Sequence, residues 1–249
     1  MSRSDKPDIE VLLRGNGYAA IAKPPGFAVG AERNKPGETP LLDAIAAALG
    51  TDKVMVVHRL DRETSGVMLV ATEPEAHRAL SLAFQRREVQ KQYLALIRGV
   101  PHEAEGEIDA PLEKDPGHAG HMRIARRGDG KPSVTRWSVR ERFRGYSLLE
   151  VRPETGRMHQ IRVHLRHAGL PLAVDPAYGG AAGIFLSELK RGYKPARDRP
   201  EAAVLGRVSL HAERLAFLDP TSGAEVRVEA SPPKDLRRAL DLIAQHTPA

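Results

Sequence analysis

The sequence predicts an α+β fold built on a largely antiparallel, mixed β-sheet with flanking helices. Predicted strands outnumber predicted helices, and the two do not alternate as they do in a doubly wound parallel sheet. No glycine-rich phosphate-binding fingerprint follows a predicted strand. With 249 residues and no internal repeat, the chain is long enough to bury a sizeable core.

Turn residues and hydrophobic spacing define the elements of the first half. Residues 11–22 form a predicted strand pair around Gly15-Asn16-Gly17, and Lys23-Pro24-Pro25-Gly26 is a predicted rigid turn. A helix is expected to begin at Thr39-Pro40 and to stop at Gly50. Thr72-Glu73-Pro74-Glu75 has the pattern of a capping box. Periodicity then predicts short strands at 54–57 and 67–71, a helix at 76–84 and a strand at 91–98.

The second half is richer in predicted strands. Residues 101–133 are rich in glycine and charge, which predicts hairpins and loops. Residues 158–167 have helical spacing, and Gly169 and Pro171 stop that helix. The remaining predictions are a β-rich stretch at 136–152, a helical turn or two near 185–190, strands at 208–215 and 224–229, and a helix at 234–245.

Composition excludes several classes of protein. The absence of cysteine excludes disulfides, cysteine-based zinc sites and thiol catalysis. No apolar run approaches the ~20 residues of a membrane helix. The net charge is +6, and the basic residues cluster, notably at 190–199. Such clusters suit a polyanion such as RNA, although a solvated charged face fits equally well.

The most informative segment lies between the predicted strands 54–57 and 67–71. There Asp61 stands between Arg59 and Arg62, and Ser65-Gly66 offers a tight turn. Rigid strands on both sides would hold such a loop still, and the guanidinium groups would keep Asp61 ionised, as a carboxylate nucleophile requires. On these residues alone, a surface ion-pair cluster is the simpler interpretation.

Several longer motifs favour a catalytic role for this segment over a surface ion-pair cluster. In order and separation they resemble the RluA branch of pseudouridine synthases: HRLDRETSGVMLVA at 58–71, KQYLALIRG at 91–99, TGRMHQIRVHL at 155–165 and DPAYG at 175–179. KPPG at 23–26 and LHA at 210–212 also match. The resemblance covers roughly residues 11–218 and implies a pseudouridine-synthase-like fold with a catalytic cleft.

The resemblance implies a role for individual residues. Asp61 matches the catalytic aspartate that attacks the target uridine, at either the base or the sugar C1′. Tyr93 matches a tyrosine that packs on the base, and Arg162 an arginine that pairs with the aspartate. Arg59 matches an arginine that replaces the extruded nucleotide in the RNA, because a base must be flipped out before it can react. The predicted substrate-binding set is His58, Arg59, Arg62, Arg157, His159 and Gln160.

The same resemblance implies the wider organisation. A short polar tail at 1–10 precedes a single catalytic domain at 11–249, in the form that lacks the small N-terminal RNA-binding domain. The implied reaction isomerises specific uridines of structured RNA, either ribosomal or transfer RNA, without a metal or other cofactor. A monomer in the cytoplasm, without membrane attachment, is expected, and the basic residues 190–199 are candidates for gripping RNA.

The sequence also bears on other functions. A non-catalytic RNA-binding protein that keeps the fold is the principal alternative, and the set of Asp61, Tyr93 and Arg162 argues against it. A metal-dependent RNA hydrolase would need clustered carboxylates that the sequence lacks. His159, His164 and His167 lack the spacing of a zinc motif, and Ser65 lacks the glycine-flanked elbow of a hydrolase nucleophile.

Overall fold

The computed structural model describes residues 7–30, 41–126, 130–196 and 198–248. The chain forms two compact units, Met1–Gln92 with His211–Ser231 and Tyr93–Leu210 with Pro232–Ala249. We call them unit 1 and unit 2. The proposed single catalytic domain at 11–249 would contain both. Within the described ranges, no helix is long and apolar enough to cross a bilayer.

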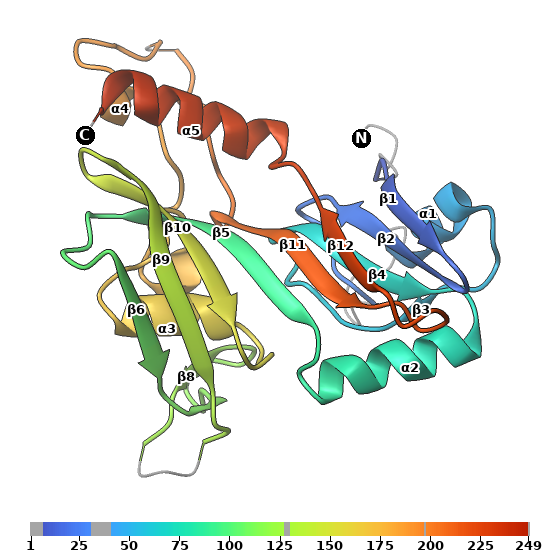
Figure 1. The fold of residues 1–249 in the computed structure, drawn as a ribbon. Helices are drawn as coiled ribbons and strands as arrows, with labels where there is room; N and C mark the ends of the chain where they lie inside the picture. The colour runs from blue at the N-terminus through green and yellow to red at the C-terminus, as the bar shows by residue number, and fades with distance from the viewer. Residues whose placement is uncertain (1–6, 31–40, 127–129, 197, 249) are drawn as a thin grey trace. The chain divides into compact units, whose positions relative to one another are not determined.

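Unit 1 contains a mixed sheet with the strand order β1-β2-β4-β11 (Figure 1). The strand pair predicted at 11–22 is confirmed as β1 (Glu10–Gly15) and β2 (Tyr18–Lys23). β4 (Ser65–Ala71) pairs antiparallel with β2 and parallel with β11 (Leu210–Leu218). Two short strands complete the sheet: β3 (Met55–Val56) pairs with β4, and β12 (Glu225–Glu229) pairs with β11.

The described residues of unit 1 include two helices. α1 (Leu41–Leu49) ends before Gly50 as predicted, whereas its predicted start at Thr39-Pro40 lies outside the described residues. α2 (Pro74–Gln85) packs Ala76 and Leu80 against a cluster that includes apolar residues of β2, β4, β11 and β12.

The predicted capping box before α2 is wrong. Pro74 occupies the first helical turn, which makes Glu73 the N-cap, and no side chain caps the helix. The Thr72 and Glu73 N–H groups instead donate hydrogen bonds to the Gly17 carbonyl, at 2.8 and 3.1 Å. The β1–β2 turn therefore fixes the backbone that leads into α2.

The strands of unit 2 run in the order β5-β10-β9-β6, and every pair is antiparallel. β5 (Gln90–Arg98) begins in unit 1, and β6 (Glu105–Asp109), β9 (Val134–Phe143) and β10 (Tyr146–Pro153) follow it. Of the hairpins predicted at 101–133, one is confirmed, because β7 (Leu112–Lys114) pairs with β8 (Met122–Ile124). β6 pairs instead with β9, which begins beyond this range.

A bulge in β9 sets which side chains enter which core. The register shifts between Leu148 and Leu149, whose partners are Glu141 and Val139, so that β9 has one extra residue there. Before the bulge, Trp137 and Val139 pack in one cluster; after it, Phe143 packs in the other. The inserted residue thus lets a single strand serve both faces of the sheet.

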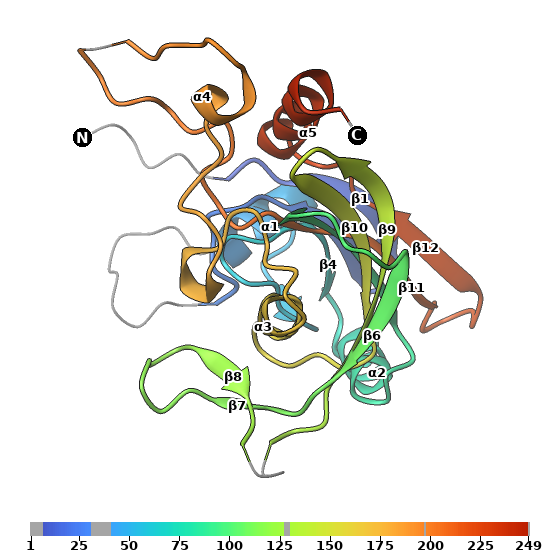
Figure 2. The ribbon, with the colours of Figure 1, turned by 90° about the vertical axis from the view of Figure 1, so that its left-hand side faces the viewer.

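Helices cover both faces of this sheet. α3 (Gln160–His167) buries Ile161 and Leu165 against one face, and α5 (Lys234–His246) packs three residues on the other. In Figure 2, α3 is seen beside the strands β6, β9 and β10. The helix predicted at 158–167 is confirmed as α3, which begins two residues later than predicted. The helical turn predicted near 185–190 is α4 (Leu186–Leu189). A 3-10 turn, η1 (Pro176–Tyr178), lies between α3 and α4.

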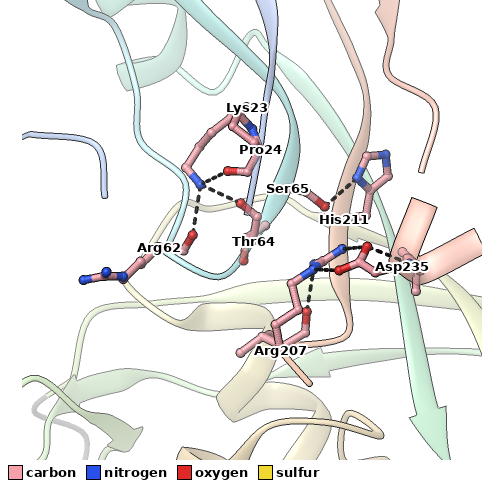
Figure 3. Close-up of polar contacts among 10 residues, drawn as sticks. Lys23, Pro24, Arg62, Thr64, Ser65, Arg207, His211 and Asp235 are labelled. Carbon is pink, nitrogen blue, oxygen red and sulfur yellow. Dashed lines mark hydrogen bonds and ion pairs between the residues drawn. The ribbon is translucent and has the colours of Figure 1, made fainter. Parts of the chain in front are cut away.

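A partly buried ion pair fixes the start of α5. The Arg207 guanidinium donates from Nε and Nη2 to the Asp235 carboxylate, at 2.7 and 3.0 Å, and from Nη1 to the Val208 carbonyl (Figure 3). Such a two-point contact fixes direction as well as distance. It ties the first turn of α5 to the backbone just before β11.

Candidate active site

Asp61 lies in unit 1, in the loop that connects β3 to β4. The Thr64 N–H donates to the Asp61 carbonyl at 3.1 Å and closes a tight turn through Arg62 and Glu63. The Asp61 side chain is half-buried, Leu60 before it is buried, and Arg59 is exposed. The loop thus places a carboxylate just before the first residue of a fully buried strand, β4.

A buried lysine anchors this loop through hydrogen bonds to its backbone. The Lys23 ammonium donates to the carbonyls of Pro24, Arg62 and Thr64, at 2.9, 3.0 and 2.9 Å (Figure 3). Lys23 is only 1% exposed. The Gly26 N–H donates to the same Arg62 carbonyl at 2.9 Å. Because an ammonium group has three donors, these three bonds use all of them, and they join the KPPG turn to both flanks of the Asp61 turn.

Replacing Lys23 should therefore destabilise unit 1. Lys23→Met keeps the length of the side chain but removes three charge-assisted bonds to carbonyls, and we expect the free energy of unfolding to fall by about 2–4 kcal/mol. Urea denaturation would measure the loss. Lys53→Met is the matched control, since Lys53 is exposed, and it should change stability by less than about 0.5 kcal/mol. Equal stability of the two variants would contradict the anchoring role.

The Ser65-Gly66 pair at the start of β4 is fixed by β11. The Ser65 hydroxyl lies 3.0 Å from His211 Nδ1, and His211 Nε2 lies 2.9 Å from the Ala230 carbonyl (Figure 3). Since a carbonyl only accepts, a neutral His211 ring donates from Nε2 and accepts the Ser65 proton at Nδ1. Gly66 has φ 121°, and a Cβ there would lie 2.1 Å from the Ala212 carbonyl oxygen. Only glycine fits this close parallel approach.

His58, predicted to bind substrate, makes its contacts inside unit 1. Its Nε2 accepts a hydrogen bond from the Leu69 N–H at 2.9 Å, and its ring stacks on Phe84 with centroids 4.3 Å apart. The ring keeps some exposed area, yet its surroundings are dense enough to desolvate it. Desolvation, with a smaller effect of Lys91, lowers the pKa of His58 to about 3. These contacts favour a structural role, and contact with RNA stays a prediction.

The low pKa of His58 predicts acid sensitivity. The unfolded chain binds a proton at this ring below about pH 6.5 and the folded chain only below about pH 3, so stability present at neutral pH is lost as the pH falls between those values. From pH 7 to pH 5 the loss is about 2 kcal/mol. His58→Gln keeps an acceptor for Leu69 but does not titrate. Urea midpoints at both pH values should fall less in the variant, and parallel falls would contradict this explanation.

Two of the predicted catalytic residues belong to unit 2. Tyr93 lies on β5 opposite Val151 of β10, half-buried against the cluster that contains Ala95 and Leu149. Arg162 lies on α3 and is 8% exposed. Asp61, in unit 1, and these two residues are thus supplied by different units of the chain. A pairing of Arg162 with Asp61 stays a prediction.

Arg162 forms a buried ion pair with a residue that sequence reasoning did not assign to the site. Its Nε and Nη2 donate to the Asp175 carboxylate at 2.7 and 2.8 Å, and Asp175 is 1% exposed. The guanidinium carbon also lies 4.8 Å from the centre of the Tyr178 ring, in cation–π geometry. Two of the five guanidinium donors are used by Asp175. The DPAYG motif at 175–179 was the available signal, since it placed a carboxylate and an aromatic ring after α3.

The remaining predicted substrate contacts surround the start of α3. The Gln160 amide oxygen accepts from the Thr155 hydroxyl and the Arg157 N–H, and its nitrogen donates to the Val134 carbonyl and the Thr135 hydroxyl. These four bonds use the full capacity of the amide. They favour a role for Gln160 in shaping the 155–160 loop, and its contact with RNA stays a prediction.

The neighbours of Gln160 are more accessible. His159 has a left-handed backbone, with φ 54°, and its Nδ1 lies 2.7 Å from the Tyr178 hydroxyl. Arg157 is half-buried, and its guanidinium lies 3.4 Å from the Pro132 carbonyl. Both remain predicted RNA contacts. Among the described residues, no group of three or more His, Asp or Glu side chains could hold a metal ion.

Comparison with known proteins identifies the family to which this arrangement belongs. Residues 17–167 match the family model described as RNA pseudouridylate synthase. The chain belongs to this family. The predicted membership of the RluA branch is thereby confirmed, together with the α+β pseudouridine-synthase fold. The family and its named members indicate RNA pseudouridine synthase activity, which is an isomerase activity.

The similar proteins include bacterial ribosomal enzymes. "Ribosomal large subunit pseudouridine synthase D" of Xanthomonas campestris pv. campestris is 39% identical over 95% of this chain and 70% of its own. "Ribosomal large subunit pseudouridine synthase C" of Escherichia coli K12 is 40% identical over 74% of this chain and 54% of its own. The solved structure "Human RNA Pseudouridylate Synthase Domain Containing 1" has a TM-score of 0.74 at 26% identity, covering 100% of this chain and 92% of the human one.

Proposed function

We propose that this protein converts specific uridines of structured RNA to pseudouridine, with Asp61 as the nucleophile. The observation that carries the proposal is the rigid presentation of Asp61, a half-buried carboxylate on a turn whose Arg62 and Thr64 carbonyls accept hydrogen bonds from Lys23. A nucleophile held by buried strands and a buried ammonium loses little entropy on reaching the reactive geometry.

The reaction balances without an oxidant, reductant or metal ion. The bond between uracil N1 and the sugar C1′ breaks, the uracil turns, and a bond from C5 to C1′ forms. The proton at C5 is lost and N1 gains one. We assign to Asp61 the attack that detaches the base, whether at the base or at C1′, and to Tyr93 packing on the detached uracil and the proton at C5. Arg162 is proposed to orient Asp61 from the rigid α3 helix.

The target nucleotide must leave its helix before this chemistry, because stacking hides the sugar–base bond. Arg59 is exposed in the loop that carries Asp61, and we propose that it occupies the space left by the flipped nucleotide. Arg62, Arg157 and His159 are proposed to hold the neighbouring RNA. These roles rest on their position beside Asp61 and Arg162 in sequence and on their partial or full exposure.

Ribosomal RNA is the substrate that the relatives favour. The two bacterial relatives named above act, by their names, on the large ribosomal subunit, and they are 39% and 40% identical to this chain. We therefore propose large-subunit ribosomal RNA over transfer RNA, and a monomeric enzyme working in the cytoplasm. The chain spans 70% and 54% of these relatives, so this assignment of substrate is part of the proposal.

The test is a pseudouridine assay with the purified protein. Unmodified large-subunit ribosomal RNA and unmodified transfer RNA are incubated separately with the enzyme, and carbodiimide-dependent stops of reverse transcription map each pseudouridine. We expect stops at one or a few uridines of the ribosomal RNA. Stops in transfer RNA alone would overturn the choice of substrate. RNA binding without stops in either RNA would favour the non-catalytic RNA-binding protein.

A further inference from the structure

Unit 2 has a depression of about 500 Å³ that contains none of the residues assigned above to catalysis. It is formed where the β9–β10 turn, helix α4 and the C-terminal end of α5 come together. The walls include three arginines and one carboxylate: Arg98, Arg144, Arg191 and Glu188. These four side chains together carry a net charge of +2. We call it the arginine depression.

Local contacts hold two of these guanidinium groups in place. Arg98 donates to Glu188 at 3.1 Å and lies over the Tyr146 ring, 5.5 Å from its centre. The backbone N–H of Arg144 donates to the Thr247 carbonyl at 2.9 Å, and its side chain reaches the His246 carbonyl at 3.4 Å. Both arginines remain exposed, Arg98 with 48% of its side chain, so they keep donors that face solvent at a fixed place. Preorganised donors of this kind cost little entropy on binding an anion.

The third arginine lies on an exposed turn directly after α4. The Tyr193 N–H donates to the Lys190 carbonyl at 3.1 Å, which closes the turn over Arg191. The Tyr193 side chain is 38% exposed, one of few large apolar side chains open to solvent in the described chain, and Lys194 follows it. Basic side chains beside an exposed aromatic ring suit single-stranded nucleic acid, in which phosphates meet cations and bases stack on the ring.

We propose that the arginine depression and the turn at 190–194 bind the phosphate backbone and an unpaired base of the RNA outside the target nucleotide. The inference rests on the proposed function, because it takes RNA as the substrate. Arg98, Arg144 and Arg191 would contact phosphates, where bidentate guanidinium geometry is favourable, and Tyr193 would stack on a base. The basic cluster seen in the sequence at 190–199 would then be completed by arginines from β5 and from the β9–β10 turn.

The main test is a double charge reversal, Arg144→Glu with Arg191→Glu. We expect the Kd for the ribosomal RNA substrate to rise at least about 10-fold at 0.1 M salt, and the slope of log K against log salt to become shallower by about 1.5 to 2. Turnover at limiting RNA should fall by a similar factor. The matched control is Arg237→Glu with Arg238→Glu, two exposed arginines of α5 with the same total change in charge. It should change Kd less than about 3-fold.

Stacking has its own test at Tyr193. Tyr193→Ala should weaken RNA binding about 5- to 20-fold, and Tyr193→Phe should restore it. Thermal midpoints of all variants within about 3 °C of the parent would show that they fold, as expected for exposed residues.

The outcomes separate this inference from the proposed function. If the parent protein forms pseudouridine but the reversal binds RNA as tightly as the parent, or if the α5 control weakens binding equally, the inference is overturned while the function stands. If the parent forms no pseudouridine yet loses RNA binding on Arg144→Glu with Arg191→Glu, the function fails and the RNA surface stands.

Discussion

Asp61→Asn should reduce pseudouridine formation by at least about 1,000-fold. The amide has the size and shape of the carboxylate but lacks its charge and its nucleophilic oxygen, so the first step of the reaction cannot proceed. The turn should survive, because its closing bond runs between the Thr64 N–H and the backbone carbonyl of residue 61. The bonds from Lys23 to the Arg62 and Thr64 carbonyls run to the backbone, and the substitution keeps these acceptors. The measurement is the single-turnover rate on the ribosomal RNA substrate.

The controls make this result specific. RNA affinity and the urea midpoint of Asp61→Asn should stay within about 3-fold and about 0.5 kcal/mol of the parent values. Asp52→Asn makes the same chemical change at an exposed position in unit 1 and should retain full turnover. Retained turnover in Asp61→Asn would show that another group is the nucleophile. Equal losses in both variants would point to a general effect of charge on RNA encounter.

Arg162→Ala should have the largest effect on stability. It leaves the Asp175 carboxylate, 1% exposed, without the guanidinium that now donates to both of its oxygens. Breaking a buried pair from one side costs about 3–5 kcal/mol, because an uncompensated charge remains inside. Loss of the contact with the Tyr178 ring adds to this. Urea denaturation should record the loss, and turnover should fall with it.

A second substitution separates stability from catalysis. Adding Asp175→Asn to Arg162→Ala removes the buried charge and should recover part of the lost stability. If Arg162 also orients Asp61, turnover should stay low in this double variant, with the loss in kcat and not in KM. Arg162→Lys keeps the charge but not the planar guanidinium, and its turnover should also stay low, with the loss in kcat. Recovery of turnover together with stability would show that Arg162 acts through Asp175 alone.

Local patterns in the sequence were sufficient for most of the elements. Alternation and turn residues at 11–22 predicted β1 and β2, and helical spacing predicted α2, α3 and α5. Such predictions succeed where neighbours along the chain decide the conformation. The capping box at 72–75 failed because the partner of those N–H groups is the Gly17 carbonyl, which lies in another turn, far away in sequence.

The candidate site shows the same division. The sequence motifs predicted Asp61, Tyr93 and Arg162 as site residues, but they did not predict what Lys23, in the KPPG turn, would contact. In the structure Lys23 reaches the Thr64 carbonyl, 41 residues away, and Ser65 meets His211, 146 residues away. Asp175 likewise became the partner of Arg162 only once α3 and the segment after it were folded together.

The sequence by itself determined the family, the order of the strands and helices along the chain, and the candidate nucleophile, because these depend on residue types at fixed local spacing. Only the tertiary structure decided which distant groups pack together, which hydrogen-bond capacities are already filled and which arginines of β5, the β9–β10 turn and the turn after α4 share one depression. Those properties depend on contacts between segments that are distant in the sequence, and local residue patterns do not specify which distant segments meet.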